Sequence, residues 1–170
     1  QLGVPRKSHK EQHGYLALRG QGRVTGTLLG GCLDSLHDLI YPVRYQDEPE
    51  VAKKYQLFPQ DWTNKILFIE TSEDKITPVT YRTYLEHLDE HGVLAQVKAI
   101  LVGKPQNETY FDVYQQVLLD VTQPYKTPIL YNLNFGHAYP RTVLPYGLQT
   151  TVDFDQRQVT VDEPYFADKL

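Results

Sequence analysis

The sequence has little that could cross-link the chain or anchor it in a membrane. Cys32 is the only cysteine among 170 residues, so no internal disulfide can form and the chain fits a reducing compartment. Its longest apolar runs, such as residues 100–102, are far too short to span a bilayer. Charged residues stand near the N-terminus where a signal peptide needs an apolar stretch. We therefore predict a cytoplasmic protein with no membrane partner.

The chain also lacks a strong excess of charge of either sign. It has 17 Lys and Arg residues against 21 Asp and Glu residues, a net charge of −4, which gives no reason to expect nucleic acid as a partner. The length suits one domain with a real core. Because the chain begins with Gln1 rather than Met, we expect a piece of a longer protein. We predict a polar arm or linker at residues 1–13 and the domain at residues 14–170.

Hydrophobic periodicity predicts an α/β fold with a mixed sheet and flanking helices. Strands are expected at residues 15–19, 23–29, 66–69, 97–102, 129–133, 148–154 and 158–161. A short helix should begin near Cys32, a second at Thr77 and Pro78, and a third should cover residues 110–121. Gly30 and Gly31 are expected to break the strand pattern, and residues 42–59 to form a long loop with one turn of helix. The strand–helix alternation in the middle implies parallel strands, and the last two strands form a hairpin.

Two residues stand where open α/β sheets gather their chemistry, beyond the carboxyl ends of strands. Glu70 directly ends a buried strand, and His137 follows another strand by four residues. If these strands are neighbours, the carboxylate can bond one ring nitrogen and leave the other free as a general base. The alternative is structural: Glu70 caps a helix or pairs with a lysine, and His137 fills a turn.

A nucleophile to complete such a triad is not obvious. Ser8, Ser35 and Ser72 all lack the sharp glycine-flanked turn that exposes a nucleophilic serine. Cys32 follows two glycines near a helix N-terminus, where a thiolate is favoured, so a Cys32–His137–Glu70 triad is conceivable. The alternative is a small buried hydrophobic residue.

No metal or cofactor is expected. His87 and His91 stand four apart on a helix, as do His9 and His13 in the arm, but the acidic residue between His87 and His91 is misplaced for a zinc-protease motif. Histidines in the last turns of a helix are also favoured by the helix dipole. Trp62 is expected in the core.

Four segments in register resemble the C-terminal domain of the LD-carboxypeptidase and microcin C immunity family of serine peptidases. They are residues 22–33, ending Gly-Gly-Cys-Leu; 65–73, with Glu70; 102–105, Val-Gly-Lys-Pro; and 134–140, with His137, followed by Leu-Pro-Tyr-Gly at 144–147. The match runs from about Gly14 to Val161. It implies a swivelling β/β/α-type domain whose nucleophilic serine lies on an N-terminal domain that this chain lacks. It also implies a homodimer of the parent protein.

The resemblance assigns roles to individual residues. Glu70 orients His137, which is the base. Gly31 and Cys32, and the loop with Glu73 and Asp74, border the substrate cleft, although many relatives have Asn where this chain has Cys32. Substrates would be murein LD-peptides or microcin C-like peptidyl or aminoacyl adenylates, and residues 70–78 resemble the immunity branch more. The isolated chain is then expected to be a folded, inactive domain, with a stand-alone cysteine hydrolase as the other alternative.

Overall fold

The computed structural model describes residue 3 and residues 10–166, and it contains one mixed seven-stranded sheet. The strand order is β1-β5-β4-β3-β2-β6-β7. The strands are β1 (Leu16–Arg19), β2 (Arg23–Cys32), β3 (Lys65–Glu70), β4 (Ala99–Gly103), β5 (Ile129–Leu133), β6 (Gln149–Asp153) and β7 (Gln158–Val161). Strands β2, β3, β4 and β5 run parallel, whereas β1, β6 and β7 pair antiparallel. The predicted fold class, α/β with a mixed sheet, is confirmed.

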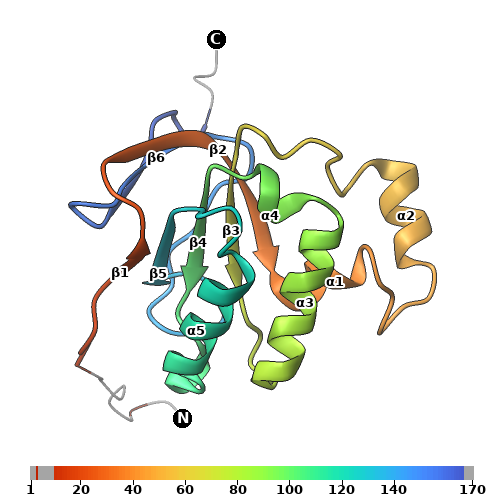
Figure 1. Ribbon diagram of the computed structural model, residues 1–170, viewed down its shortest axis with the longest axis horizontal. Coiled ribbons are helices and arrows are strands. Elements are labelled where there is room, and N and C mark those ends of the chain that lie inside the picture. The colour runs from red at the N-terminus through yellow and green to blue at the C-terminus, as the bar shows by residue number, and fades with distance from the viewer. Residues whose placement is uncertain (1–2, 4–9, 167–170) are drawn as a thin grey trace.

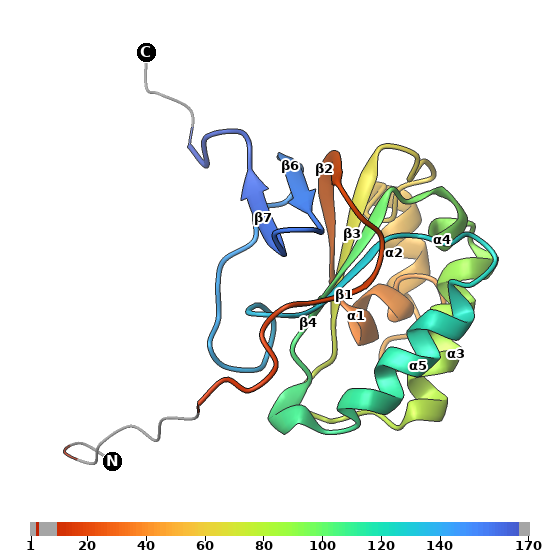
Figure 2. The same cartoon turned by 60° about the vertical axis from the view of Figure 1, so that its left-hand side comes forward.

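The helices gather on one face of this curled sheet, as Figure 2 shows. They are α1 (Leu33–Asp38), α2 (Glu48–Tyr55), α3 (Pro78–Glu90), α4 (Val93–Gln96) and α5 (Phe111–Val121), with a short 3₁₀ turn at Gln106–Glu108. A first core packs between helices and sheet and includes Leu67, Leu85 and Leu118, each fully buried. A second core on the other face includes Leu28, Ile66 and Val152. Apolar side chains thus cover both faces of β3, as its unbroken apolar run predicts.

Local sequence signals explain how α3 begins and ends. Thr77 is the N-cap, and its side chain accepts a hydrogen bond from the backbone N–H of Thr80 at 3.2 Å. Pro78 occupies the first helical position, where its missing N–H costs nothing. Past the end of the helix, Gly92 adopts a left-handed conformation with φ 73°. The predicted start of this helix at Thr77 and Pro78 is confirmed.

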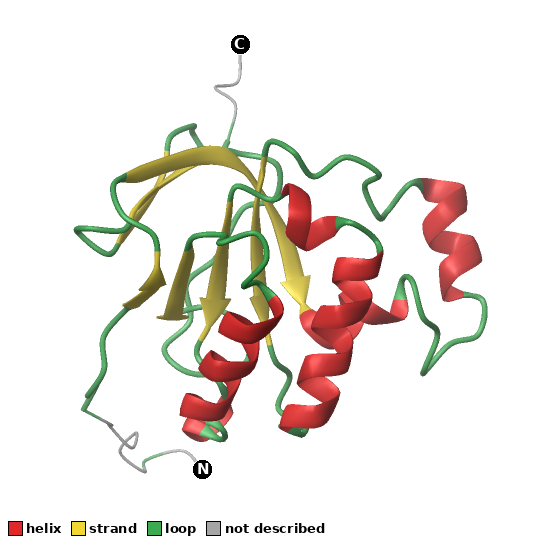
Figure 3. Ribbon diagram, in the orientation of Figure 1, coloured by secondary structure: helices red, strands yellow, loops and turns green. Residues whose placement is uncertain are grey.

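Two expectations about the first third of the chain are wrong. Gly30 and Gly31 do not break β2, which continues to Cys32. The missing Cβ of Gly30 allows close approach to β3, since a Cβ there would lie 1.8 Å from the Phe68 carbonyl oxygen. Residues 42–59 are not a loop with one turn, because α2 occupies eight of them (Figure 3). Strands β1 and β2 adjoin in sequence but do not pair: β1 pairs with β5 and β2 with β3 and β6.

The four parallel strands place their carboxyl ends at one edge of the sheet, where their arrowheads point together in Figure 1. Cys32 ends β2, Glu70 ends β3, Gly103 ends β4 and Leu133 ends β5. Cys32 and Glu70 are direct partners in the β2–β3 register. The side chains expected to carry chemistry therefore meet at this edge.

Candidate active site

The structure brings Glu70 and His137 together. Glu70 is 6% exposed at the end of β3. Nδ1 of His137 lies 2.9 Å from each carboxylate oxygen, and the backbone N–H of His137 donates to Oε2 at 3.0 Å. Because the carboxylate accepts from Nδ1, the neutral ring carries its proton there and presents Nε2 as the basic nitrogen.

The hydrogen bond that His137 donates to Glu70 also raises the pKa of His137 above its ordinary value, although partial burial opposes the shift. In the described chain, Nε2 of His137 lies 3.2 Å from Oε2 of Glu73. Glu73 is exposed, so its side chain can leave when another group approaches Nε2. The protonated imidazole is thus held on one side by a buried carboxylate and on the other by a displaceable one.

Two glycines leave the space that the Glu70 side chain fills. A Cβ on Gly136, which has φ +91°, would lie 2.5 Å from Oε2 of Glu70. A Cβ on Gly103 would lie 2.7 Å from Cβ of Glu70 and 2.8 Å from the Phe135 carbonyl oxygen. The Glu70 side chain is therefore confined by backbone at its Cβ and at its carboxylate, and its orientation toward His137 is fixed by packing as well as by hydrogen bonds.

Cys32 lies beside this pair, but its thiol is not activated. Burial, together with the nearby charges of Glu70 and Asp34, raises the pKa of Cys32 to about 12. Its Sγ lies 3.5 Å from Oδ2 of Asp34. A thiol with this pKa is protonated at neutral pH and is a poor nucleophile.

Cys32, Glu70 and His137 each offer a ligand atom within 4.8 Å of the others, the one such group of three among the described residues. Glu70 and the Nδ1 nitrogen of His137 are already hydrogen-bonded to one another. This bond suits a proton-transfer pair.

The other residues predicted to border the cleft lie around the same edge. Gly31 faces Tyr146, whose hydroxyl would be 3.0 Å from a Cβ at that position. Glu73 contacts His137, and Asp74 is exposed one residue further on. The sequence reasoning missed Tyr146 as a cleft residue, although the Leu-Pro-Tyr-Gly segment that contains it was recognised. The centroid of the Tyr146 ring lies 5.3 Å from that of the Phe68 ring.

The remaining candidates do not join the site. His87 Nδ1 lies 2.8 Å from His37 Nε2, and His91 Nδ1 bonds the His87 carbonyl oxygen, so the two helical histidines do not converge on a common point. Ser35 accepts from Arg44 at 3.2 Å. Ser8 and His9 lie outside the described residues. Trp62 is 1% exposed, which confirms its place in the core.

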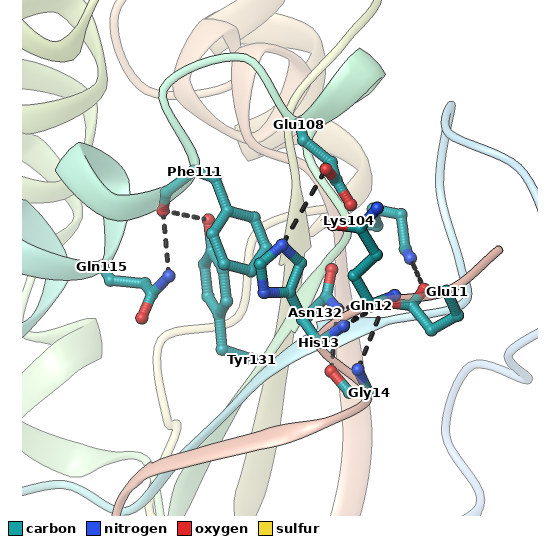
Figure 4. A network of polar contacts seen from close by, with 10 residues as sticks. All are labelled: Glu11, Gln12, His13, Gly14, Lys104, Glu108, Phe111, Gln115, Tyr131 and Asn132. Carbon is teal, nitrogen blue, oxygen red and sulfur yellow. Dashed lines mark hydrogen bonds and ion pairs between the residues drawn. The ribbon is translucent and has the colours of Figure 1, made fainter. Parts of the chain in front are cut away.

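A polar network beside the ends of β4 and β5 holds residues 11–14 (Figure 4). Buried Lys104 donates to Glu11, and this bond is the main cause that lowers the pKa of Glu11 to about 2. The other carboxylate oxygen of Glu11 accepts the backbone N–H groups of residues 12–14, and Asn132 Nδ2 donates to the Gly14 carbonyl at 2.7 Å. The last part of the predicted arm is thus fixed to the domain, while residues 1–2 and 4–9 of that arm lie outside the described part of the chain.

No helix in the described residues is long and apolar enough to cross a membrane.

Comparisons with known proteins agree with this fold. The family model of the LD-carboxypeptidase C-terminal domain matches residues 25–152. A putative carboxypeptidase of Vibrio cholerae is 31% identical over 147 residues, which are 85% of this chain and 40% of that protein. The microcin C7 self-immunity protein MccF of Escherichia coli is 27% identical over 169 residues, 96% of this chain and 43% of that protein.

A solved structure adds a nearer relative. The MccF-like protein from Streptococcus pneumoniae, in complex with AMP, superposes with a TM-score of 0.87 at 43% identity, over 95% of this chain and 47% of that one. The chain thus spans less than half the length of these relatives. By the match to the family model over most of its length, this chain belongs to the family of the LD-carboxypeptidase C-terminal domain.

Proposed function

We propose that this domain supplies the Glu and His of a Ser-Glu-His triad in an amide hydrolase, and that the serine comes from an N-terminal domain of the parent protein. The observation that supports this is the Glu70–His137 pair, with the carboxylate bonded to Nδ1 and to the backbone of the imidazole. That arrangement fixes the ring and stabilises the imidazolium that forms when Nε2 takes a proton. The family's carboxypeptidase relatives agree with hydrolysis of an amide.

In the proposed reaction, His137 Nε2 takes the serine proton while the serine oxygen attacks the amide carbon. The proton then goes to the leaving nitrogen as the C–N bond breaks, and water repeats the cycle on the acyl enzyme. Glu73 must leave Nε2 before the serine can approach it. Glu70 keeps the ring in place throughout.

The substrate that we propose is a peptidyl or aminoacyl nucleotide. AMP is bound to the Streptococcus pneumoniae relative, and residues 70–78 resemble the microcin-immunity branch. A murein LD-peptide is the second candidate, since a putative carboxypeptidase is among the relatives.

The test compares the parent protein with this 170-residue chain. Each is incubated with an aminoacyl sulfamoyl adenosine and with a muropeptide tetrapeptide, and products are followed by mass spectrometry. We expect only the parent to cut. His137→Ala in the parent should lower turnover by about 10⁴-fold or more with little loss of stability. His91→Ala, at an exposed histidine, is the matched control and should leave turnover unchanged. Near-normal turnover in His137→Ala would refute the assignment.

A cysteine hydrolase within this chain is the competing function, since Cys32 lies within reach of His137 and Glu70. The raised pKa of its thiol argues against it. Hydrolysis by the chain alone that is lost on iodoacetamide treatment would establish the cysteine enzyme and remove the split triad.

A further inference from the structure

A cavity of about 270 Å³ is lined by Cys32, whose Sγ lies within 4.8 Å of ligand atoms of Glu70 and His137. It lies between the end of β2, α1, the start of α2 and residues 57–62. Gly31, Cys32 and Tyr146 line it at the side of the candidate active site. Since Cys32 is also the register partner of Glu70, a molecule held over the catalytic pair can extend directly into the cavity.

The walls of this cavity are mainly apolar. They include Leu29, Leu36, Leu39, Leu57, Phe58 and Trp62. The volume is just below the range of about 300–1,000 Å³ for pockets that enclose a whole ligand. The cavity therefore suits one substituent of a larger molecule, and apolar walls favour an apolar substituent.

Glu48 is the one charged residue among those that line the cavity. It is the first residue of α2, where the helix dipole favours a carboxylate. Its Oε2 is buried and accepts no hydrogen bond from the described residues. An ionised carboxylate only accepts hydrogen bonds, so it repels a phosphate or carboxylate and favours a group that carries N–H donors.

We propose that this cavity is a specificity pocket that takes an apolar ring with an N–H donor from the substrate and excludes anionic groups, with Glu48 as the acceptor. This inference rests on the proposed function, because the ring belongs to the substrate that is proposed there. The ring can come from either half of an aminoacyl nucleotide: the amino-bearing base, or an aromatic side chain such as indole. The phosphate or sulfamoyl linkage stays outside, over the catalytic pair.

Binding is measured on the 170-residue chain by NMR, from the shifts of the Trp62 indole N–H and the Leu29 and Leu36 methyl groups. Adenosine and tryptophanamide are the probes for the two halves, and phenyl phosphate is the anionic comparison. We expect binding in the millimolar range for at least one of the first two and none for phenyl phosphate. The probe that binds identifies which half of the substrate enters the cavity.

Glu48→Gln should weaken the affinity for the probe by about fivefold or more, since hydrogen bonds to a charged acceptor are stronger than those to a neutral one. Glu50→Gln is the matched control, because Glu50 is exposed in the first turn of the same helix. Leu36→Trp, which fills the cavity, should abolish binding while the resonances of the β6–β7 hairpin stay unchanged.

Absence of shifts at Trp62, Leu29 and Leu36 with both probes overturns the inference, as does equal binding by the Glu48→Gln and Glu50→Gln variants. Binding to this chain but not to the parent means that the nucleophile domain covers the cavity, and this outcome overturns it too. Failure of the proposed function would be seen in a separate measurement, as normal turnover by the parent protein that carries His137→Ala.

Discussion

Gly136 tests whether the Glu70 carboxylate is held by packing. A Cβ at this position meets Oε2, Cδ and Cγ of Glu70 at 2.5–2.6 Å, so Gly136→Ala must push the carboxylate away from His137. Alanine at φ +91° costs about 1–2 kcal/mol by itself. Loss of the hydrogen bonds to a buried carboxylate adds about 1.5–3 kcal/mol. We expect Gly136→Ala to lower the free energy of unfolding by about 2.5–5 kcal/mol.

Gly147→Ala isolates the backbone part of this cost. Gly147 has φ +79°, but a Cβ there meets nothing within 4 Å. Its substitution should cost only about 1–2 kcal/mol. The difference between the two variants then measures the displacement of Glu70.

Urea unfolding followed by the fluorescence of Trp62, the only tryptophan and a buried one, gives both values. A double-mutant cycle with Glu70→Ala completes the measurement, because Gly136→Ala should cost only the backbone part once the carboxylate is gone. If Gly136→Ala costs no more than Gly147→Ala, or the same with and without Glu70, the carboxylate is not confined as described.

Two further predictions concern charged pairs. In Glu70→Gln, the pKa of His137 should fall toward its ordinary value of 6.5, as seen by NMR of the imidazole protons. Because the pKa of His137 is raised in the folded chain, the pair stabilises the fold fully below the unfolded pKa of this histidine. The stabilisation is lost as pH rises through the folded pKa. A pH–stability curve that Glu70→Gln leaves unchanged contradicts this. In Glu11→Gln, the chain should lose about 1–2 kcal/mol at pH 7, less than for a fully buried pair because Glu11 is 41% exposed. The folded pKa of Glu11 is depressed to about 2 from 4.5, so its contribution to stability is present above pH 4.5 and fades as pH falls toward 2. Equal acid sensitivity of the variant and the native chain would refute this prediction.

The sequence predicts best the elements whose own residues decide their structure. The apolar run of β3 and the Thr77–Pro78 start of α3 depend on local pattern, and the structure confirms both. The meeting of Glu70 and His137 was also foreseeable, since both follow parallel strands and such ends share one edge of the sheet. Their roles in a triad remain predictions.

Contacts between distant segments could not be foreseen in the same way. No local signal shows that β1 pairs with β5, more than 100 residues along the chain. Glycine often breaks a strand, but Gly30 continues β2 because the backbone of β3 occupies the space that a side chain would need. The pairing of Glu11 with Lys104 and the cavity walls drawn from β2, α1 and residues 57–62 likewise exist only after folding.

The cavity and the Glu70–His137 pair are built from largely different segments of the chain, and laboratory evolution can use this separation. Most of the cavity wall comes from the crossover between β2 and β3, which contains α1, α2 and residues 57–62. The Glu70–His137 pair depends instead on β3, the segment after β5 and the two glycines that confine the carboxylate. A library randomised at Leu36, Leu39 and Leu57 would therefore vary the shape of the cavity while the carboxylate and imidazole keep their positions. Under the function proposed above, selection from such a library should alter substrate preference without changing the Glu70–His137 pair.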